Sequence, residues 1–312
     1  MFAIYLNVMH LPKEKWSSGL ITLFFFFGSL TLHAQRIPVP ASGSIVRMDT
    51  CTYPGLLPRI VDVWLPPQYQ QNQEQRFPVL YMHDGQNLFD GSLSYGGKEW
   101  GVDEVMRDSM IPPAIVVGIW NSAQRRREYG PQACYAALPK HLRDSILDEF
   151  GGFVLSDTYL SFIVQGLKPE IDRRFRTLPD RSHTYVAGSS FGGLISMYAL
   201  CEYPDVFGAA ACLSTHWPGS IRHAFPEIPK SFLTYLSKKT KVLRRLGSRI
   251  YFDCGNQTLD SLYPAWQQQA DSILRRGLPG NHWQSLFFPG AEHNEVFWRE
   301  RLALPLRFML KK

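Results

Sequence analysis

A serine flanked by glycines, Gly188-Ser189-Ser190-Phe191-Gly192, is the part of the chain best suited to chemistry. A short β-prone stretch, 185–187, enters this motif, and a segment with helical apolar spacing leaves it. A sharp strand-to-helix turn of this kind presents one serine hydroxyl to a cleft, and glycines two positions before and after it avoid collisions with neighbouring strands. The pattern predicts Ser190 as a nucleophile, whereas Ser189 fills the variable position of the motif.

A serine nucleophile of this type needs a general base, which follows it in the chain after an acidic residue. His293 lies in a loop between a β-prone run, 283–288, and a final helix-prone stretch. Because α/β enzymes assemble their sites at the carboxyl ends of strands, we predict His293 as the base. The alternative interpretation is an ordinary surface histidine.

The acid that orients the base is expected on the loop after the strand-like run 249–254. Asp260 on that loop is the favoured candidate, and Asp253 at the end of the strand is the alternative. Asp260 also has a structural interpretation as the N-cap of the following helix, because an aspartate there accepts hydrogen bonds from the first helical amides.

The same chemistry needs donors for the negative oxygen of the tetrahedral intermediate. A preorganised backbone N–H group typically contributes about 2.7–4 kcal/mol to this stabilisation. The amide of Phe191, directly after the nucleophile, is one predicted donor. The second is the amide of Gln86, in the loop after the strand-like run 78–82, where Gly85 permits a tight turn.

Several short stretches, taken in their order along the chain, form a specific set: residues 77–89, 100–104, 127–131, 188–193, 203–207 and 289–295. This set resembles the esterase D-like family of the α/β-hydrolase superfamily, which holds enterochelin esterases, feruloyl and acetylxylan esterases, and mycolyltransferases. The resemblance runs from about Val61 to the C-terminus. It implies Ser190 as nucleophile, His293 as base and an acid in the loop 255–260. It also implies Gln86 and Phe191 as oxyanion donors.

Three residues in loops are candidates for binding the substrate: Trp100, Arg127 and Trp217. Arg127 follows the strand-like run 114–120, so it can reach the rim of a site, where a positive charge would suit acidic or phenolic acyl esters. Trp217 follows the run 209–214 and is a candidate floor for an acyl or sugar group. Plain packing in the core is the alternative for Trp217.

The first 34 residues are interpreted as a cleavable signal peptide. They combine Lys13 and Lys15 with an apolar run, 19–32, and an alanine at the predicted cleavage site. The run is shorter than the ~20 residues needed to cross a bilayer, which predicts no stable membrane insertion after cleavage. An uncleaved anchor is the alternative. We therefore expect a secreted or periplasmic protein whose residues 35–312 form one esterase domain.

Strand-like runs alternate with helix-like segments throughout residues 35–312. The strand-like runs lie at 59–65, 78–83, 114–120, 184–188, 208–213, 249–254 and 283–288, and the helix-like segments include 157–175, 194–203, 262–276 and 295–310. Alternation of this kind predicts an α/β-hydrolase fold, with a mostly parallel central sheet and helices on both of its faces.

The composition argues against other classes of function. The net charge is +6, but the basic residues are scattered and no aromatic platform lies among them, so a nucleic-acid partner is not expected. The five cysteines form no CxxC motif and no His/Cys cluster, so no metal is expected, and the predicted chemistry requires no cofactor. Cys201 and Cys212 lie in apolar contexts and are interpreted as small core residues.

Together these observations predict a secreted serine carboxylic-ester hydrolase that works through Ser190, His293, Asp260 and an acyl-enzyme. The expected partner is a small-molecule or oligosaccharide ester. Acetyl or feruloyl groups on carbohydrates come first, and siderophore trilactones come second by resemblance. Two other functions stay open, namely acyl transfer of the mycolyltransferase kind and ligand binding by an inactive hydrolase fold.

Overall fold

One eight-stranded sheet carries the fold in the computed structural model, which describes residues 36–311. The predicted signal peptide therefore lies outside the described residues. The strand order is β1-β2-β4-β3-β5-β6-β7-β8, and β2 runs antiparallel to both β1 and β4, while all strands from β4 to β8 in that order are parallel. The strands are β1 Ser44–Cys51, β2 Arg59–Leu65, β3 Val79–His83, β4 Ile115–Ile119, β5 Thr184–Ser189, β6 Ala209–Leu213, β7 Arg249–Cys254 and β8 Trp283–Phe287.

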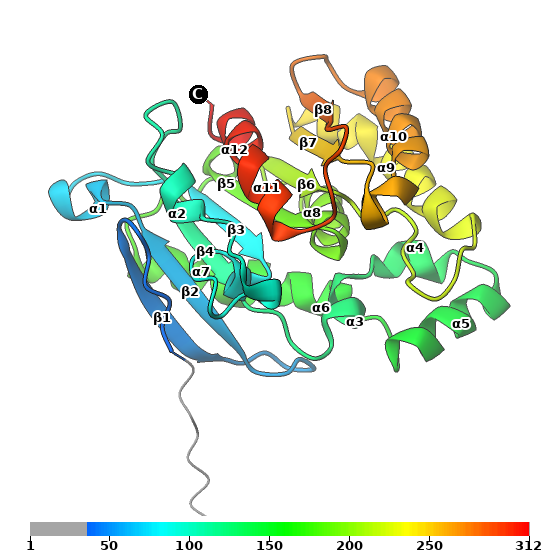
Figure 1. The fold of residues 1–312 in the computed structure, drawn as a ribbon, viewed down its shortest axis with the longest axis horizontal. Helices are drawn as coiled ribbons and strands as arrows, with labels where there is room; N and C mark the ends of the chain where they lie inside the picture. Colours follow the sequence, from blue (N-terminus) through cyan, green and yellow to red (C-terminus); the bar gives the residue numbers. More distant parts are fainter. Residues whose placement is uncertain (1–35, 312) are drawn as a thin grey trace, which may run out of the picture. The chain divides into compact units, whose positions relative to one another are not determined.

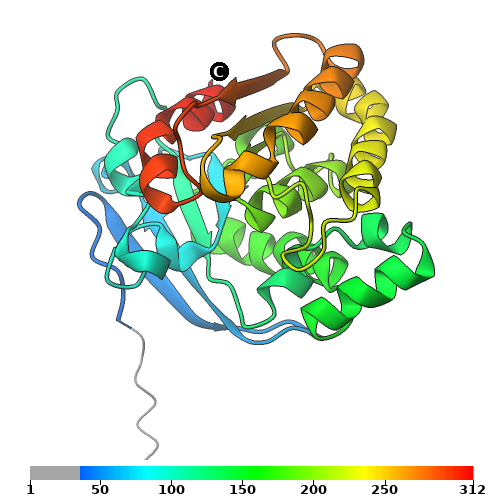
Figure 2. The same cartoon turned by 45° about the vertical axis from the view of Figure 1, so that its right-hand side comes forward.

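Helices pack on both faces of this sheet (Figures 1 and 2). The α-helices are α1 Gln68–Gln71, α2 Val102–Val105, α3 Arg125–Tyr129, α4 Gln132–Ala136, α5 Lys140–Phe150, α6 Ser156–Ser161, α7 Lys168–Arg174, α8 Phe191–Glu202, α9 Glu227–Arg245, α10 Pro264–Gly277, α11 Glu295–Arg301 and α12 Ala303–Leu310. A π-helical stretch, Phe162–Leu167, joins α6 to α7.

The alternation of side chains along each strand divides the interior into two cores. On β3, Val79 and Tyr81 point into the core beneath α8, α9 and α10, whereas Leu80 and Met82 point into the core beneath α2, α11 and α12. Because successive side chains of a strand point to opposite faces, a strand that is apolar throughout must be covered on both sides. The sequence of β3 therefore accounts for its central place.

The predicted fold class is confirmed, and each predicted strand is present. The structure adds the edge strand β1 and the long helix α9, which were not among the predicted elements. The predicted helix over 295–310 is two helices, α11 and α12, which meet at Leu302.

Helix α8, which begins directly after the predicted nucleophile, lies against the middle of the sheet. All of its residues except Glu202 are buried, and it packs on β5 and β6. Its sequence is apolar on every side, which is the composition expected of a helix surrounded by protein. Helix α8 therefore provides a rigid base for the turn that precedes it.

The five cysteines are free thiols, four of them buried and Cys51 half-buried. Burial raises the pKa of Cys201 to about 12, so this thiol stays protonated and acts as a small apolar core residue. Across residues 36–311, none of the helices combines the length and the apolar character needed to cross a membrane.

Candidate active site

Ser190 occupies a strained turn between β5 and α8. Its backbone has φ 59° and ψ −124°, a conformation that a residue with a side chain rarely adopts. A side chain at Gly188 would place its Cβ 2.8 Å from the carbonyl carbon of Gly192, so the motif needs its glycine there. The amide of Ser190 donates a hydrogen bond to the carbonyl of Leu213 on β6 at 3.0 Å, and this bond helps to hold the strained residue in place.

His293 and Asp260 meet at the carboxyl end of the sheet. Nδ1 of His293 lies 2.6 Å from Oδ1 of Asp260, although the two residues come from separate loops after β8 and β7. The backbone amide of His293 also donates to the side-chain oxygen of Thr258 at 2.9 Å. Because Nδ1 is paired with the carboxylate, Nε2 is the ring nitrogen left to exchange a proton with a reacting group.

The carboxylate of Asp260 is fully buried and hydrogen-bonded on both oxygens. Its Oδ2 atom accepts hydrogen bonds from the hydroxyl of Ser214 at 2.7 Å and from the amide of Gly255 at 2.6 Å. Burial alone would raise the pKa of Asp260, but the hydrogen bonds from His293, Ser214 and Gly255 outweigh it and hold the pKa below its ordinary value. Asp260 is therefore an ionised partner for the imidazole.

Asp253, the alternative acid, points elsewhere. It is fully buried, and its Oδ1 atom accepts a hydrogen bond from Arg301 at 3.0 Å, while its Oδ2 atom accepts one from Tyr251 at 3.1 Å. Burial raises its pKa in spite of these contacts. The geometry therefore favours Asp260 over Asp253 as the partner of His293.

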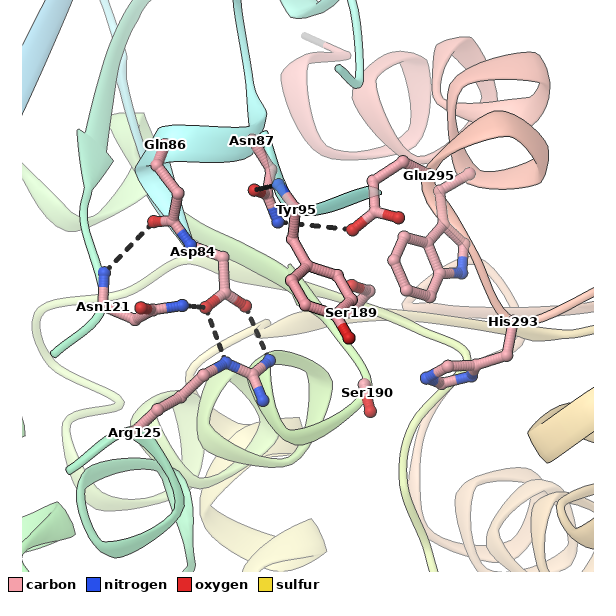
Figure 3. A pocket seen from close by; sticks show the side chains of 11 residues that line it. Asp84, Gln86, Asn87, Tyr95, Asn121, Arg125, Ser189, Ser190, His293 and Glu295 are labelled. Atoms are coloured by element: carbon pink, nitrogen blue, oxygen red, sulfur yellow. Dashed lines mark hydrogen bonds and ion pairs between the residues drawn. The ribbon is translucent and has the colours of Figure 1, made fainter. Parts of the chain in front are cut away.

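A cavity of about 350 Å³ opens beside Ser190. Figure 3 shows the ring of His293 pointing toward Ser190 across this cavity. The other lining residues are Asp84, Gln86, Asn87, Tyr95, Asn121, Arg125, Ser189, Glu295 and Trp298. Three of the predicted residues, Ser190, His293 and Gln86, thus face one space, and most of the other residues that line it have polar side chains.

A second cavity, of about 540 Å³, shares Ser190 with the first. Its wall includes Phe191, Phe150 and Ile221, and the successive arginines of α3 line it as well. Arg127 is one of these arginines, and its Nε atom donates to the carbonyl of Phe153 at 2.7 Å. The position of Arg127 agrees with its predicted place at the rim of a site.

The loop that carries Gln86 approaches the site from the end of β3. Asp84 has a left-handed backbone, φ 58°, and Gly85 packs so closely on the backbone of Gly118 that a Cβ atom would not fit. The side-chain oxygen of Gln86 accepts a hydrogen bond from the amide of Asn121 at 3.2 Å. Among the described residues, the backbone N–H groups of Gln86 and Phe191 have no acceptor, so both are free to bind an oxyanion.

An ion pair holds this loop in place. Nε and Nη2 of Arg125 each lie 2.7 Å from a different oxygen of Asp84, and Nδ2 of Asn121 donates to the same carboxylate at 2.6 Å (Figure 3). Burial would raise the pKa of Asp84, but the Arg125 guanidinium outweighs burial and keeps the pKa low. The Asp84 carboxylate is therefore committed to the loop and is not available as a base.

The two predicted tryptophans lie in the core. Trp217 is fully buried, donates a hydrogen bond to the side chain of Gln267 at 2.9 Å and packs on Phe252. Trp100 is buried against Trp298, with ring centroids 5.5 Å apart. Neither lines a cavity beside Ser190, so their predicted role in substrate binding is corrected to packing. The turn after β6 folds inward, which takes Trp217 away from the cleft.

Several residues of the site were not predicted. Asn121 and Arg125 follow the carboxyl end of β4, and Glu295 comes two residues after His293. The rule that loops after parallel strands form the site, applied to every strand, would have found these three. Tyr95 also lies in the connection that follows β3, but it is 12 residues beyond the end of that strand and carries no local signal.

The parallel sheet and the helices on both of its faces form an α/β-hydrolase fold. Residues 58–309 match the model of the family described as "Putative esterase", and the chain belongs to that family. Among solved structures, a ferulic acid esterase superposes with a TM-score of 0.60 at 19% identity, covering 86% of this chain and 98% of that one. An IroE-like serine hydrolase from Shewanella oneidensis superposes with a TM-score of 0.63 at 21% identity, covering 86% and 80% of the two chains. The enterobactin esterase from Shigella flexneri gives a TM-score of 0.58 at 18% identity, covering 87% and 60%.

Two relatives also match by sequence. The uncharacterized protein YbbA of Bacillus subtilis is 29% identical over 156 residues, which are 50% of this chain and 56% of that protein. An endo-1,4-beta-xylanase/feruloyl esterase of Xylanibacter ruminicola is 26% identical over 167 residues, 52% of this chain and 20% of that protein. The matched segment thus spans about half of the first relative and a fifth of the second.

Proposed function

We propose that the protein is a secreted serine esterase that hydrolyses esters of carbohydrates through an acyl-enzyme. The observation that carries the proposal is the convergence of three groups on one cavity: the hydroxyl of Ser190, the imidazole of His293 and the loop of Gln86. The hydrogen bond of 2.6 Å between His293 and Asp260 supports the assignment of base and acid. Membership of the esterase family supports the class of reaction.

In the first step, the Ser190 hydroxyl attacks the ester carbonyl while Nε2 of His293 takes its proton. The amides of Gln86 and Phe191 bind the oxyanion, and each such donor is typically worth about 2.7–4 kcal/mol in the transition state. Asp260 keeps the imidazole in the required tautomer and stabilises the imidazolium. The imidazolium then protonates the departing alkoxide, and water, deprotonated by His293, hydrolyses the acyl-serine.

Two observations support an acylated carbohydrate as the substrate. The first cavity is lined by Asn87, Asn121 and Glu295, whose side chains suit the hydroxyl groups of a sugar. The Xylanibacter ruminicola relative is an endo-1,4-beta-xylanase/feruloyl esterase, and a ferulic acid esterase shares the fold. Acetyl or feruloyl esters are therefore the proposed acyl groups.

A siderophore trilactone is the second candidate. The arginines beside the second cavity, among them Arg127, favour it because they suit acidic phenolic acyl groups. An enterobactin esterase is among the structures with the same fold. Secretion is part of the proposal as well, and it is supported by the apolar run in residues 1–34.

Hydrolysis of p-nitrophenyl acetate by the wild type and by Ser190→Ala tests the reaction. We expect kcat to fall by about 10⁴-fold or more in the variant, because the nucleophile is removed. Ser189→Ala is the matched control, since that serine is the neighbour of the proposed nucleophile, and it should keep most of the activity. Equal release of nitrophenol by wild type and Ser190→Ala would refute the proposal.

A panel of acetyl, feruloyl and catecholate esters, compared by kcat/KM, tests the substrate class. Carbohydrate esters should have the highest kcat/KM. If a catecholate lactone has the highest value, the siderophore trilactone becomes the proposed substrate. Adding an acceptor alcohol separates hydrolysis from acyl transfer. A transferred product in excess over the free acid would reassign the protein as an acyltransferase.

A further inference from the structure

Helix α11 begins directly after the His293 loop, and its buried face reaches the far side of Asp260. Trp298 and Arg301, three residues apart on this face, both donate to the hydroxyl oxygen of Ser214, at 3.0 and 2.8 Å. Ser214 is fully buried at the end of β6 and has a left-handed backbone, φ 41°. Its hydroxyl lies 2.7 Å from Oδ2 of Asp260.

The hydrogen-bonding capacity of these groups determines where the Ser214 proton goes. A hydroxyl has one proton and two lone pairs, whereas the indole of Trp298 and the guanidinium of Arg301 can only donate. Both lone pairs of Ser214 are therefore occupied, and its proton has one remaining acceptor, Oδ2 of Asp260. The direction of this hydrogen bond is imposed by the two donors on α11.

The same assignment of donors and acceptors can be made for Asp260 and His293. Oδ2 of Asp260 accepts hydrogen bonds from the Ser214 hydroxyl and the Gly255 amide, so this oxygen does not carry a proton of its own. Oδ1 faces Nδ1 of His293 at 2.6 Å. An ionised carboxylate at this distance requires a proton on Nδ1, which leaves Nε2 bare and able to accept the proton of the nucleophile.

We propose that Arg301 and Ser214 are positioning residues that set the direction of hydrogen bonding through Asp260 to His293. The inference rests on the proposed esterase function and extends it to residues that lie outside the cavity. The Nη2 atom of Arg301 lies 3.9 Å from Oδ2 of Asp260, which is close enough for an ion pair but too long for a hydrogen bond, so the hydrogen-bonded link between the two residues runs through Ser214.

The surroundings of Arg301 are unusual for a residue that only stabilises the fold. It is almost fully buried, and its Nε and Nη1 atoms have no hydrogen-bond partner among the described residues. Asp253 balances its charge at 3.0 Å, and the ring of Phe288 lies 5.0 Å from its Cζ atom. Buried donors without partners are costly, so their presence calls for a role that offsets the cost. Fixing the direction of the hydrogen bond from Ser214 to Asp260 is such a role.

Kinetic analysis of Ser214→Ala and Arg301→Met tests the proposal. We expect each to lower kcat for p-nitrophenyl acetate by about 10- to 100-fold, as for the loss of a hydrogen bond to a charged group. KM should stay within about twofold, because neither side chain lines the cavity. The double variant should lose no more than either single variant, since both residues act through one hydrogen bond. Arg301→Lys, which keeps a charged donor, should recover most of kcat.

The matched control is Arg307→Met on α12, which removes an arginine whose ion pair with Asp108 lies away from the site. It should leave kcat unchanged. Proton NMR gives a second readout, because the signal of the His293 Nδ1 proton should shift in Ser214→Ala when Asp260 loses one of its donors. If Arg301→Met does not fold, Ser214→Ala and Arg301→Lys decide the question.

Wild-type kcat in Ser214→Ala, or losses that add in the double variant, would overturn the proposal. A fall in kcat that only follows the folded fraction, measured by circular dichroism, would also overturn it. Failure of the esterase function itself is recognised separately, because Ser190→Ala would then be as active as the wild type.

Discussion

Replacing Asp84 by asparagine should weaken both the fold and the loop that carries Gln86. In the wild type, the carboxylate accepts two hydrogen bonds of 2.7 Å from Arg125 and one of 2.6 Å from Asn121. An asparagine amide cannot accept both bonds from the guanidinium, because its NH₂ group meets another donor. The variant thus leaves Arg125 without its counter-charge and frees a loop whose residue 84 is held at φ 58°.

The size of the loss of stability follows from burial. Breaking a fully buried ion pair costs about 3–5 kcal/mol. The Arg125 side chain is 28% exposed, so water can partly replace the lost partner. We therefore expect about 2 kcal/mol, which in a domain of this size lowers Tm by roughly 4–8 °C. If the Gln86 amide leaves its position, kcat falls by about 10²–10³-fold, as for the loss of one oxyanion donor.

The pH dependence supplies a further check on Asp84. Since Arg125 keeps the folded-state pKa of Asp84 below its ordinary value of about 3.9, the contribution of the pair is complete above that value. It is lost as the pH falls through the lowered folded-state pKa. The difference in unfolding free energy between the wild type and Asp84→Asn should therefore be constant from pH 7 to pH 5 and shrink below pH 4.

Urea unfolding and p-nitrophenyl acetate kinetics measure the two effects on the same samples. The control is Glu170→Gln, which removes the carboxylate of an exposed pair with Arg173 and should change neither quantity measurably. A variant Asp84→Asn with wild-type stability and wild-type kcat would refute the reasoning. Lost stability with unchanged kcat would show that the ion pair does not position Gln86.

Two further predictions concern the buried acids and a buried histidine. Asp260→Asn should lower kcat by about 10⁴-fold with a small change in Tm, because the imidazole loses the carboxylate that fixes its tautomer. Asp253→Asn should affect Tm more than kcat, because it leaves Arg301 without its counter-charge. The opposite pattern in steady-state kinetics would exchange the roles of the two aspartates. Burial lowers the pKa of His216 to about 4. The unfolded chain takes up this proton near pH 6.5, so stability should fall by about 3 kcal/mol as the pH drops from 6.5 to 4, and urea unfolding of His216→Gln should show a smaller fall across that window.

Local patterns in the sequence were sufficient to predict the elbow and the parallel sheet. The turn at Ser190 depends on glycines within two residues of it, and β3 and β5 are apolar runs bounded by turn residues. The contact between His293 and Asp260 could also be predicted from the sequence, because loops after neighbouring parallel strands meet at the same edge of a sheet. Their roles in catalysis remain predictions for the kinetic experiments.

The remaining features depend on contacts between distant parts of the chain. Ser214 and Arg301 are 87 residues apart, and nothing in either local sequence indicates that they meet. Because Trp217 follows a strand, its position in the sequence indicates a place in the cleft, but the chain turns inward at Ser214 and buries the indole. The edge strand β1 was missed because it is only half-buried and lacks the apolar run of a central strand.

The burial of α8 has a consequence for how this enzyme can change its substrate. A helix enclosed on all sides offers almost no position where a new side chain is harmless, since any change in volume must be absorbed by tightly packed neighbours. New specificity can therefore arise only where the chain is free to vary, in the loops that surround Ser190. Directed evolution confined to those loops should yield active variants far more often than the same number of substitutions spread along the helix.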